Sequence, residues 1–211
     1  MKELFLKIPE EKRNSVIQAA VDEFAEHGYE SANTNQIAKV AHISVGSLFQ
    51  YFENKEDLFF SVVRFSSQLL VNAFCEVVLE SDSFFVTVEK ILRRIIRESR
   101  EHPNYIKLYF VMTAPGKANM EREVVREMEE YSCRLYCHVI RKGQQEGVVR
   151  PDCDLHIFPF LLDNLFMMLQ FSFSCGYYQE RLKIYGGDDI LSQDDTIVEQ
   201  TIKFLKGALS S

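Results

Sequence analysis

A short run of small and polar residues near the N-terminus has the spacing of a helix surface that could hydrogen-bond to another molecule. Ser44 can cap a helix that continues to Tyr51, because its hydroxyl can accept from a backbone N–H in the first turn. Val45, Leu48 and Phe49 recur at helical spacing and are expected to face inward. The residues left outside are Ser44, Gly46, Ser47, Gln50 and Tyr51.

The residues just before this segment predict a second short helix that positions it. Ile37, Ala38 and Ala41 lie about one helical turn apart and can share a buried face, and His42 and Ile43 form the turn. Two short helices joined in this way form a helix-turn-helix, whose second helix enters the major groove of DNA. The outward hydroxyls, amide and glycine of the second helix suit that role.

The segment also resembles the DNA-binding domain of the tetracycline-repressor (TetR) family of bacterial transcription regulators. The resemblance covers about the first sixty residues and is specific, because many positions match at fixed spacing. The matching residues are Thr34, Ile37-Ala38, Ala41, Ile43-Ser44, Gly46, Leu48, Tyr51-Phe52, Lys55 and Leu58, preceded by Ala19-Ala20, Phe24 and Gly28-Tyr29. Two positions depart from the pattern: His42 stands where the family usually has Gly, and Phe49 where it usually has Tyr.

The motif and the resemblance together predict which residues meet DNA. The candidates are Thr34, Lys39, Ser44, Val45, Gly46, Ser47, Phe49, Gln50, Tyr51 and Lys55. Four of these candidates have a plainer alternative. Gly46 and Ser47 could simply face solvent, Thr34 could act only as a helix cap, and Lys55 could be an ordinary surface lysine.

The charge distribution limits how this region could bind a polyanion. The chain of 211 residues has a formal net charge of −7. Residues 1–60 hold 6 Lys and Arg against 10 Asp and Glu, so this region is acidic overall. Between Ser31 and Phe52, however, there is no acidic residue, and Lys39 is the one full positive charge. We therefore expect modest non-specific affinity, with contacts from helix N-termini, hydroxyls, Lys39 and Lys55.

The rest of the chain predicts an all-α protein of two domains, with residues 1–52 reading DNA and residues 53–211 forming a helical body. Apolar stripes recur at helical spacing, and no strand pattern competes. We expect a loop between Gly176 and Gly186-Gly187. The expected helices cover about Glu10–His27, Glu53–Leu79, a segment containing Val88 to Ile96, a short helix from Pro103, Ala118–Glu146, Asp154–Cys175 and Asp194–Leu209.

What the resemblance implies for the body is a homodimer joined through the helices at Asp154–Cys175 and Asp194–Leu209, with a cavity for a small-molecule effector. Ligand binding would then release an inverted-repeat operator. The apolar stripe expected between subunits is Val198, Ile202, Leu205 and Leu209. Dense Phe, Tyr and Met residues favour a hydrophobic or amphipathic effector. The candidate lining residues are Tyr109, Phe110, Asp163, Asn164, Phe166 and Gln170, of which Asp163 and Asn164 could instead cross-link the dimer.

Other clusters have plain interpretations beside a functional one. Arg93, Arg94, Arg97 and Arg100 could bind an acidic partner, but Glu residues four positions away indicate a solvated charged face. Cys133 and Cys137 share one helical face and could sense a metal or a redox change, or be small apolar residues.

The sequence carries none of the phosphate-binding, nucleophile or zinc-protease motifs, so we expect no enzyme, cofactor or metal. Five cysteines and no signal peptide favour the cytoplasm. The apolar run Leu155–Tyr178 is interrupted by Asp163, which argues against a membrane span. The alternative function is a helical interaction protein that keeps the fold without regulating through DNA.

Overall fold

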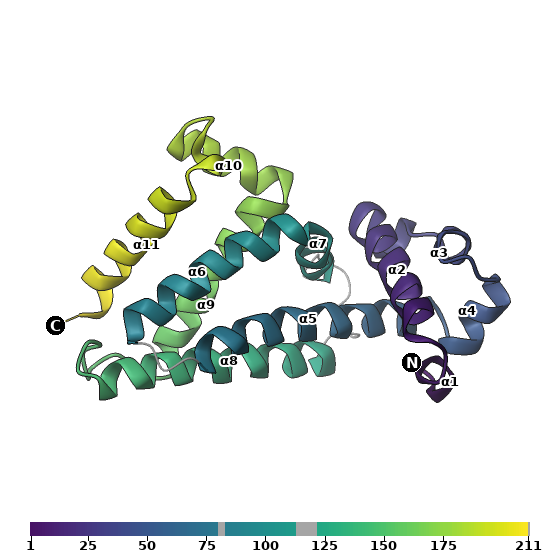
Figure 1. Cartoon of the computed structure of the whole chain (residues 1–211), viewed down its shortest axis with the longest axis horizontal. Coiled ribbons are helices and arrows are strands. Elements are labelled where there is room, and N and C mark those ends of the chain that lie inside the picture. The colour runs from purple at the N-terminus through teal and green to yellow at the C-terminus, as the bar shows by residue number, and fades with distance from the viewer. Residues whose placement is uncertain (80–82, 113–121, 211) are drawn as a thin grey trace. The chain divides into compact units, whose positions relative to one another are not determined.

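The computed structural model describes residues 1–79, 83–112 and 122–210, and this part of the chain is helical without strands (Figure 1). The predicted all-α class is therefore confirmed. The predicted start of a helix at Ala118 lies outside the described residues. The helices are α1 (Glu3–Leu6), α2 (Glu10–Ser31), α3 (Thr34–Val40), α4 (Val45–Tyr51), α5 (Lys55–Leu79), α6 (Phe84–Glu101), α7 (Pro103–Met112), α8 (Arg122–Gln145), α9 (Ile157–Ser174), α10 (Gly176–Gly186), a 3-10 turn (Ile190–Ser192) and α11 (Asp194–Leu209).

The glycines were used to predict where helices end, and the structure shows which of these predictions are correct. Gly28, which directly follows the predicted helix end at His27, has a positive φ of 69° and kinks α2, and the helix then continues to Ser31. The loop predicted between Gly176 and Gly187 is wrong, because α10 occupies it. Gly176 is the first residue of that helix, and Gly187, with φ of 92°, is its C-cap. Glycines read as breaks thus delimit a helix. The single-turn helix α1 carries too short a pattern to be predicted.

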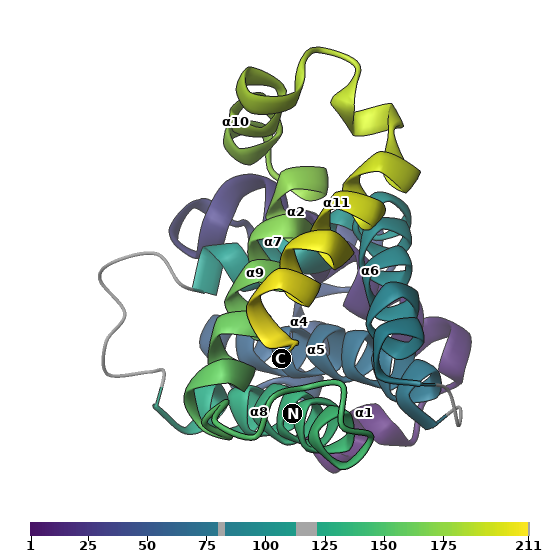
Figure 2. The ribbon, with the colours of Figure 1, turned by 90° about the vertical axis from the view of Figure 1, so that its left-hand side faces the viewer.

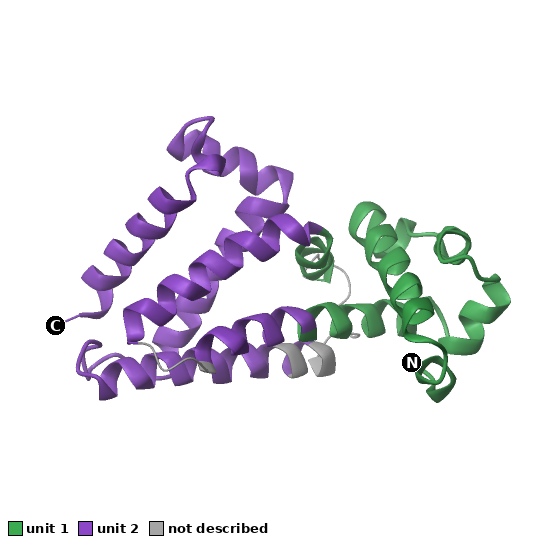
Figure 3. Ribbon diagram, in the orientation of Figure 1, with its two compact units in different colours: residues 1–68, 104–124 green, residues 69–103, 125–211 purple. Residues whose placement is uncertain are grey.

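The described chain divides into two compact units (Figure 3). The first comprises residues 1–68 and 104–124, and the second comprises residues 69–103 and 125–211. The boundary at residue 68 falls inside α5, so this helix belongs to both units. Helices α5 and α9 are long and apolar enough to cross a membrane by length and composition alone, a test that core helices of soluble proteins also pass.

The first unit is built on α2, which packs against α3. Val16, Ala20 and Phe24 are fully buried on α2, as their spacing predicts. The Phe24 ring meets the edge of Phe59 from α5, with centroids 5.0 Å apart. Helix α7 is held to α2 by polar contacts, since the Asn104 side-chain amide donates to Asp22 at 2.8 Å. These contacts join α2, against which α3 packs, to α5 and α7.

The second unit centres on α6, which packs against both α9 and α11, as the two views in Figures 1 and 2 agree. Its buried face carries Val88, Leu92 and Ile95. The α11 residues Val198, Leu205 and Leu209 are buried in this same core, so the prediction that they lie between subunits is wrong. Ile202 is half-buried against the core. An apolar stripe cannot by itself tell which surface covers it.

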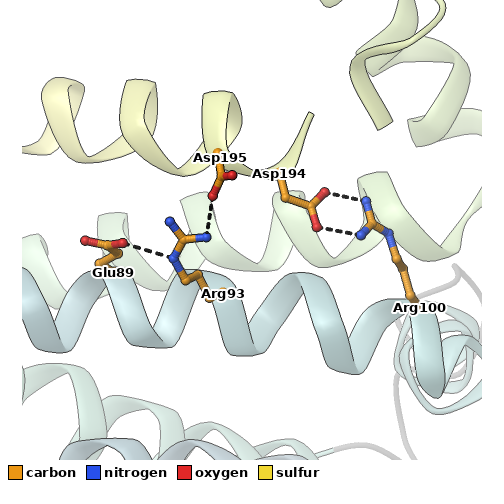
Figure 4. Close-up of polar contacts among 5 residues, drawn as sticks. All are labelled: Glu89, Arg93, Arg100, Asp194 and Asp195. Carbon is orange, nitrogen blue, oxygen red and sulfur yellow. Dashed lines mark hydrogen bonds and ion pairs between the residues drawn. The ribbon is translucent and has the colours of Figure 1, made fainter. Parts of the chain in front are cut away.

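Charged residues on α6 also fasten α11 (Figure 4). Arg100 forms a bidentate pair with Asp194, with N–O distances of 2.6 and 2.5 Å. Arg93 donates to Asp195 at 2.7 Å and to Glu89 at 2.9 Å. The arginine cluster therefore includes contacts with acidic residues of its own chain. A bidentate pair between a guanidinium and a carboxylate fixes how the two helices are oriented. Its contribution to stability is small where the pair is exposed to solvent.

Candidate nucleic-acid interface

Helix α3 is positioned by a cap and by a buried carboxylate from α2. The Asn33 side chain caps α3 by accepting from the Asn35 amide at 2.9 Å. The Asn33 backbone amide in turn donates to the carboxylate of Glu23 at 2.8 Å. The expectation that Thr34 caps this helix is therefore wrong. Asn33 is the better acceptor in this geometry, and Thr34 is the first helical residue and half-exposed.

The turn between α3 and α4 takes a backbone conformation that favours glycine. His42 has φ of 54° and is the one residue other than glycine with a positive φ in the described chain. The turn is closed by the Ile43 amide, which donates to the Ala38 carbonyl at 2.9 Å. A side chain at positive φ costs free energy that glycine avoids. His42 therefore occupies a strained position at the corner of the motif.

Helix α4 begins as predicted. The Ser44 hydroxyl accepts from the Ser47 amide at 2.9 Å, and their hydroxyl oxygens lie 2.8 Å apart. Leu48 is fully buried and anchors the helix against the unit. Gly46 and Gln50 are exposed, while Val45, Ser47 and Phe49 are half-buried. The outward surface is therefore small, polar and uncharged.

Gly46 leaves open space on this surface. Apart from the neighbouring residues and the backbone of α4 itself, the one atom of the described chain within 4 Å of a Cβ built there is the Ser44 hydroxyl oxygen, at 3.7 Å. The helix could therefore accept a side chain at position 46 without strain. Its glycine keeps the backbone free for close approach by another molecule.

The sequence predicted that the Tyr51 side chain points to solvent, and the structure shows that it is buried. Its side chain is only 6% exposed and packs against Phe5, with ring centroids 5.4 Å apart. Phe5 comes from α1, which also covers Phe52. Because α1 was not predicted, nothing in the sequence pattern indicated a cover for Tyr51. A contact between this side chain and DNA would require its hydroxyl to remain accessible at the edge of the packed rings.

The cations near the motif have different surroundings. Lys39 is exposed at the end of α3. Lys55 donates to the Glu30 carbonyl at 3.0 Å and lies over the Tyr29 ring, so its ammonium already has partners within the unit. Lys2 donates to the Phe49 carbonyl at 3.1 Å and brings a positive charge to the end of α4. No motif in the sequence identified Lys2.

The six candidate effector residues fall in two different compact units. Tyr109 and Phe110 belong to the first, and the four residues on α9 belong to the second. Phe166 is fully buried, with its ring 5.7 Å from that of Tyr136. The Asn164 amide donates to the Phe160 carbonyl of its own helix at 2.7 Å, and Gln170 is half-buried.

Asp163 is the unusual polar group of the second unit. Burial, and to a lesser extent the nearby charge of Glu129 on α8, raise its pKa to about 7. Burial, together with the charge of Asp163, also raises the pKa of Tyr136. At neutral pH the Asp163 carboxyl is thus partly protonated and can donate a hydrogen bond as well as accept one. In the described residues, no group of three or more His, Cys, Asp or Glu side chains is placed to hold a metal ion.

Comparison with known proteins identifies the motif. The family model for bacterial regulatory proteins of the tetR family matches residues 16–62, which contain α3, α4 and the turn between them. The chain belongs to the TetR family. As a TetR-family protein it is a DNA-binding transcriptional regulator, and the alternative of an interaction protein that kept only the fold is not favoured.

The similarity of this TetR-family chain to other proteins extends beyond the motif. A probable acrEF/envCD operon repressor from Escherichia coli K12 is 25% identical over 196 residues, covering 90% of this chain and 85% of the relative. The fold is shared with the regulator FadR of Bacillus subtilis, solved with stearoyl-CoA, at a TM-score of 0.72, 17% identity and coverage of 90% and 97%. AibR, solved with isovaleryl coenzyme A and operator DNA, has a TM-score of 0.68, 14% identity and coverage of 92% and 97%. The names of the curated relatives describe transcriptional regulators and repressors.

Proposed function

We propose that this regulator is a cytoplasmic repressor that binds an inverted-repeat operator as a homodimer and is released by a hydrophobic or amphipathic small molecule. Residues 1–52 are proposed to read DNA, and residues 53–211 to bind the effector and to dimerise. The observation that carries the proposal is the surface of α4, where a buried anchor at Leu48 presents Gly46 and Gln50 to solvent.

The proposed DNA contacts divide by chemistry. Gly46, Ser47 and Gln50 would approach base edges, because a small backbone surface, a hydroxyl and an amide can each meet groups in the major groove. Thr34 and Lys39 would contact phosphates, which position the protein without reading sequence. Lys55 would first have to leave the Glu30 carbonyl, or reach a phosphate while keeping that bond.

The dimer is proposed to form through α9 and α11, but with residues other than those of the predicted stripe. The two helices leave large apolar side chains in solvent, including Phe204, which is 65% exposed, and Phe160, which is 61% exposed. Ile157 and Leu161 are also exposed on α9. Apolar surface of this kind is costly in a monomer and indicates a protein partner. A two-fold dimer would place two copies of α4 on two half-sites.

The effector is proposed to be an acyl thioester or another molecule with an apolar chain and a polar end. FadR and AibR, which share the fold, were solved with acyl-coenzyme A molecules. Such a molecule suits a helical body rich in Phe and Met, with a few polar groups such as Asp163 to orient it. Binding that favours one arrangement of the dimer would loosen DNA, because coupling between two sites is reciprocal.

A gel-shift titration with the DNA upstream of the chain's own gene tests this proposal. We expect a specific complex of two chains per operator, which long-chain acyl-coenzyme A disrupts and free coenzyme A does not. The same acyl compound should raise the thermal midpoint of the DNA-free protein. Binding that is equally tight to scrambled DNA of the same composition would contradict the regulator. Disruption by free coenzyme A alone would contradict the apolar effector.

A further inference from the structure

Two cysteines of α8 lie side by side on the surface of the second unit. The sulfur atoms of Cys133 and Cys137 are 3.8 Å apart, and Cys133 is exposed. The Cys137 thiol also donates to the Leu155 carbonyl at 3.3 Å, which fixes its side chain toward the segment before α9. Neither cysteine has a part in the proposed DNA or effector sites. The pair therefore has a geometry that the regulator's function does not use.

The helix makes a disulfide between them unfavourable. Residues four apart on a helix have Cβ atoms about 5–6 Å apart, whereas a disulfide needs about 3.5–4.5 Å. Closing the bond would distort α8 by about one to two ångströms at this turn. A bridging atom avoids this strain, because each sulfur bonds to that atom and the two sulfurs can stay further apart than in a disulfide.

The surroundings also argue against a structural zinc ion. Such sites take four protein ligands, and the described residues offer no third His, Cys, Asp or Glu placed beside the pair. The Cys137 pKa is raised by burial and by its neighbour Cys133, so this thiol is protonated at neutral pH. A suitable ligand is therefore a soft centre that reacts with neutral thiols, needs only two of them, and brings its remaining substituent itself.

We propose that Cys133 and Cys137 form a binding site for trivalent arsenic compounds that carry one organic group. In the hydrated form R–As(OH)₂, two As–O bonds break and two As–S bonds form, and the two thiol protons leave with the hydroxides as two water molecules. Arsenic stays trivalent and both sulfurs keep their oxidation state, so the step needs no oxidant or reductant. The second As–S bond closes within one molecule, which makes the chelate far more stable than a single As–S bond.

The test uses the full-length reduced protein and phenylarsine oxide as the probe. Intact mass spectrometry should show one adduct per chain, and a thiol assay should show two thiols lost for each adduct. Cys133→Ser and Cys137→Ser should each raise the half-saturating concentration at least ~100-fold, since chelation is lost. Cys75→Ser changes another half-buried cysteine and should leave the titration unchanged.

Competition and folding controls keep the result unambiguous. A dithiol such as 1,2-ethanedithiol should remove the probe, whereas millimolar glutathione, a monothiol, should not. Cys133 is exposed, so Cys133→Ser is expected to fold, and thermal unfolding checks this. Tight binding that survives in folded Cys133→Ser, or removal of the probe by glutathione, would overturn the proposal. The outcome does not depend on operator binding, so it stands apart from the proposed function.

Discussion

Helix α4 and helices α9 to α11 differ in what they leave exposed to solvent. On α4 the exposed positions are Gly46 and Gln50, and the apolar anchor Leu48 is buried within its own unit. On α10 and α11 large apolar side chains remain outside, with Tyr185 at 80% and Phe204 at 65% exposure. The polar groups on α4 can hydrogen-bond to water. The apolar area on α10 and α11 is exposed to water, and a protein partner could cover it.

The difference teaches which kind of partner each surface can take. A small polar surface gains little from apolar burial and suits a hydrated, charged partner such as DNA, for which geometry decides the fit. An apolar surface gains from exclusion of water and suits another protein surface. The comparison therefore predicts that substitutions on α4 change DNA binding alone, and that those on the exposed face of α11 change assembly first.

The largest effect is expected from Gly46→Glu. A carboxylate at the closest point of approach to DNA should weaken operator binding at least ~100-fold, about 3 kcal/mol, through repulsion and bulk. Folding should be unchanged, because the position has room for a side chain. Fluorescence anisotropy with labelled operator measures the affinity.

Two further variants separate charge from bulk at this position. Gly46→Gln adds bulk without charge. Gln145→Glu adds the same charge at an exposed site near the end of α8 and should bind as the wild type does. An unchanged affinity in folded Gly46→Glu would exclude α4 as the reading helix.

Asp163→Asn should change how stability depends on pH. The pKa of Asp163 in the folded protein is about 7, above the value near 4 of an unfolded chain. The folded state thus keeps this proton longer, so the stability of the wild type falls as pH rises from about 4 to about 7. The variant should lose that decline and be more stable at pH 8 by roughly 2 kcal/mol, with no difference at pH 4.

Denaturant unfolding across this pH range provides the measurement. Asp188→Asn removes an exposed carboxylate from the same unit and serves as the control. If the wild type and Asp163→Asn give parallel curves from pH 4 to pH 8, the buried carboxyl does not titrate as its surroundings indicate.

Phe204→Glu should weaken the dimer at least ~10-fold, because a charge would be buried at the contact. Lys203→Glu, at the exposed neighbouring position, is the matched control and should have a smaller effect. Sedimentation velocity over a range of concentrations measures the dissociation constant. A wild type that stays monomeric would contradict the proposed assembly, whatever the variants do.

The smallest effect is expected from His42→Gly. Glycine accepts the φ of 54° without strain, so the free energy of unfolding should rise by about 1 kcal/mol. Operator affinity should change little, since the turn keeps its shape. Thermal unfolding detects the gain, and a loss of stability would show that the imidazole forms contacts worth more than the strain.

The sequence predicted the elements whose signals are local. The Ser44 cap and the bounds of α11 follow from residues close in the chain, and the structure bears them out. The contacts that failed are those between distant segments. Tyr51 was expected in solvent because its cover, Phe5 of α1, lies 46 positions away in the sequence and belongs to a single-turn helix.

The body shows the same limit on a larger scale. The apolar stripe of α11 correctly predicted a buried face, but not that α6 of the same chain covers it. The residues now proposed for the dimer, such as Phe204, lie off that stripe, and their spacing does not indicate that another subunit covers them. Periodicity indicates that one face of a helix is buried. Only the tertiary structure shows which other helix or subunit covers that face.

The most direct test of the account measures wild-type protein binding to its upstream inverted repeat, against the same DNA with both half-sites scrambled. Fluorescence anisotropy at a fixed, physiological salt concentration gives the two affinities. The account predicts that two chains bind the intact repeat at least ~1,000-fold more tightly than the scrambled DNA. Equal affinities for the two, or saturation at one chain per repeat, would contradict the assignment of α4 as the reading helix of a dimeric regulator.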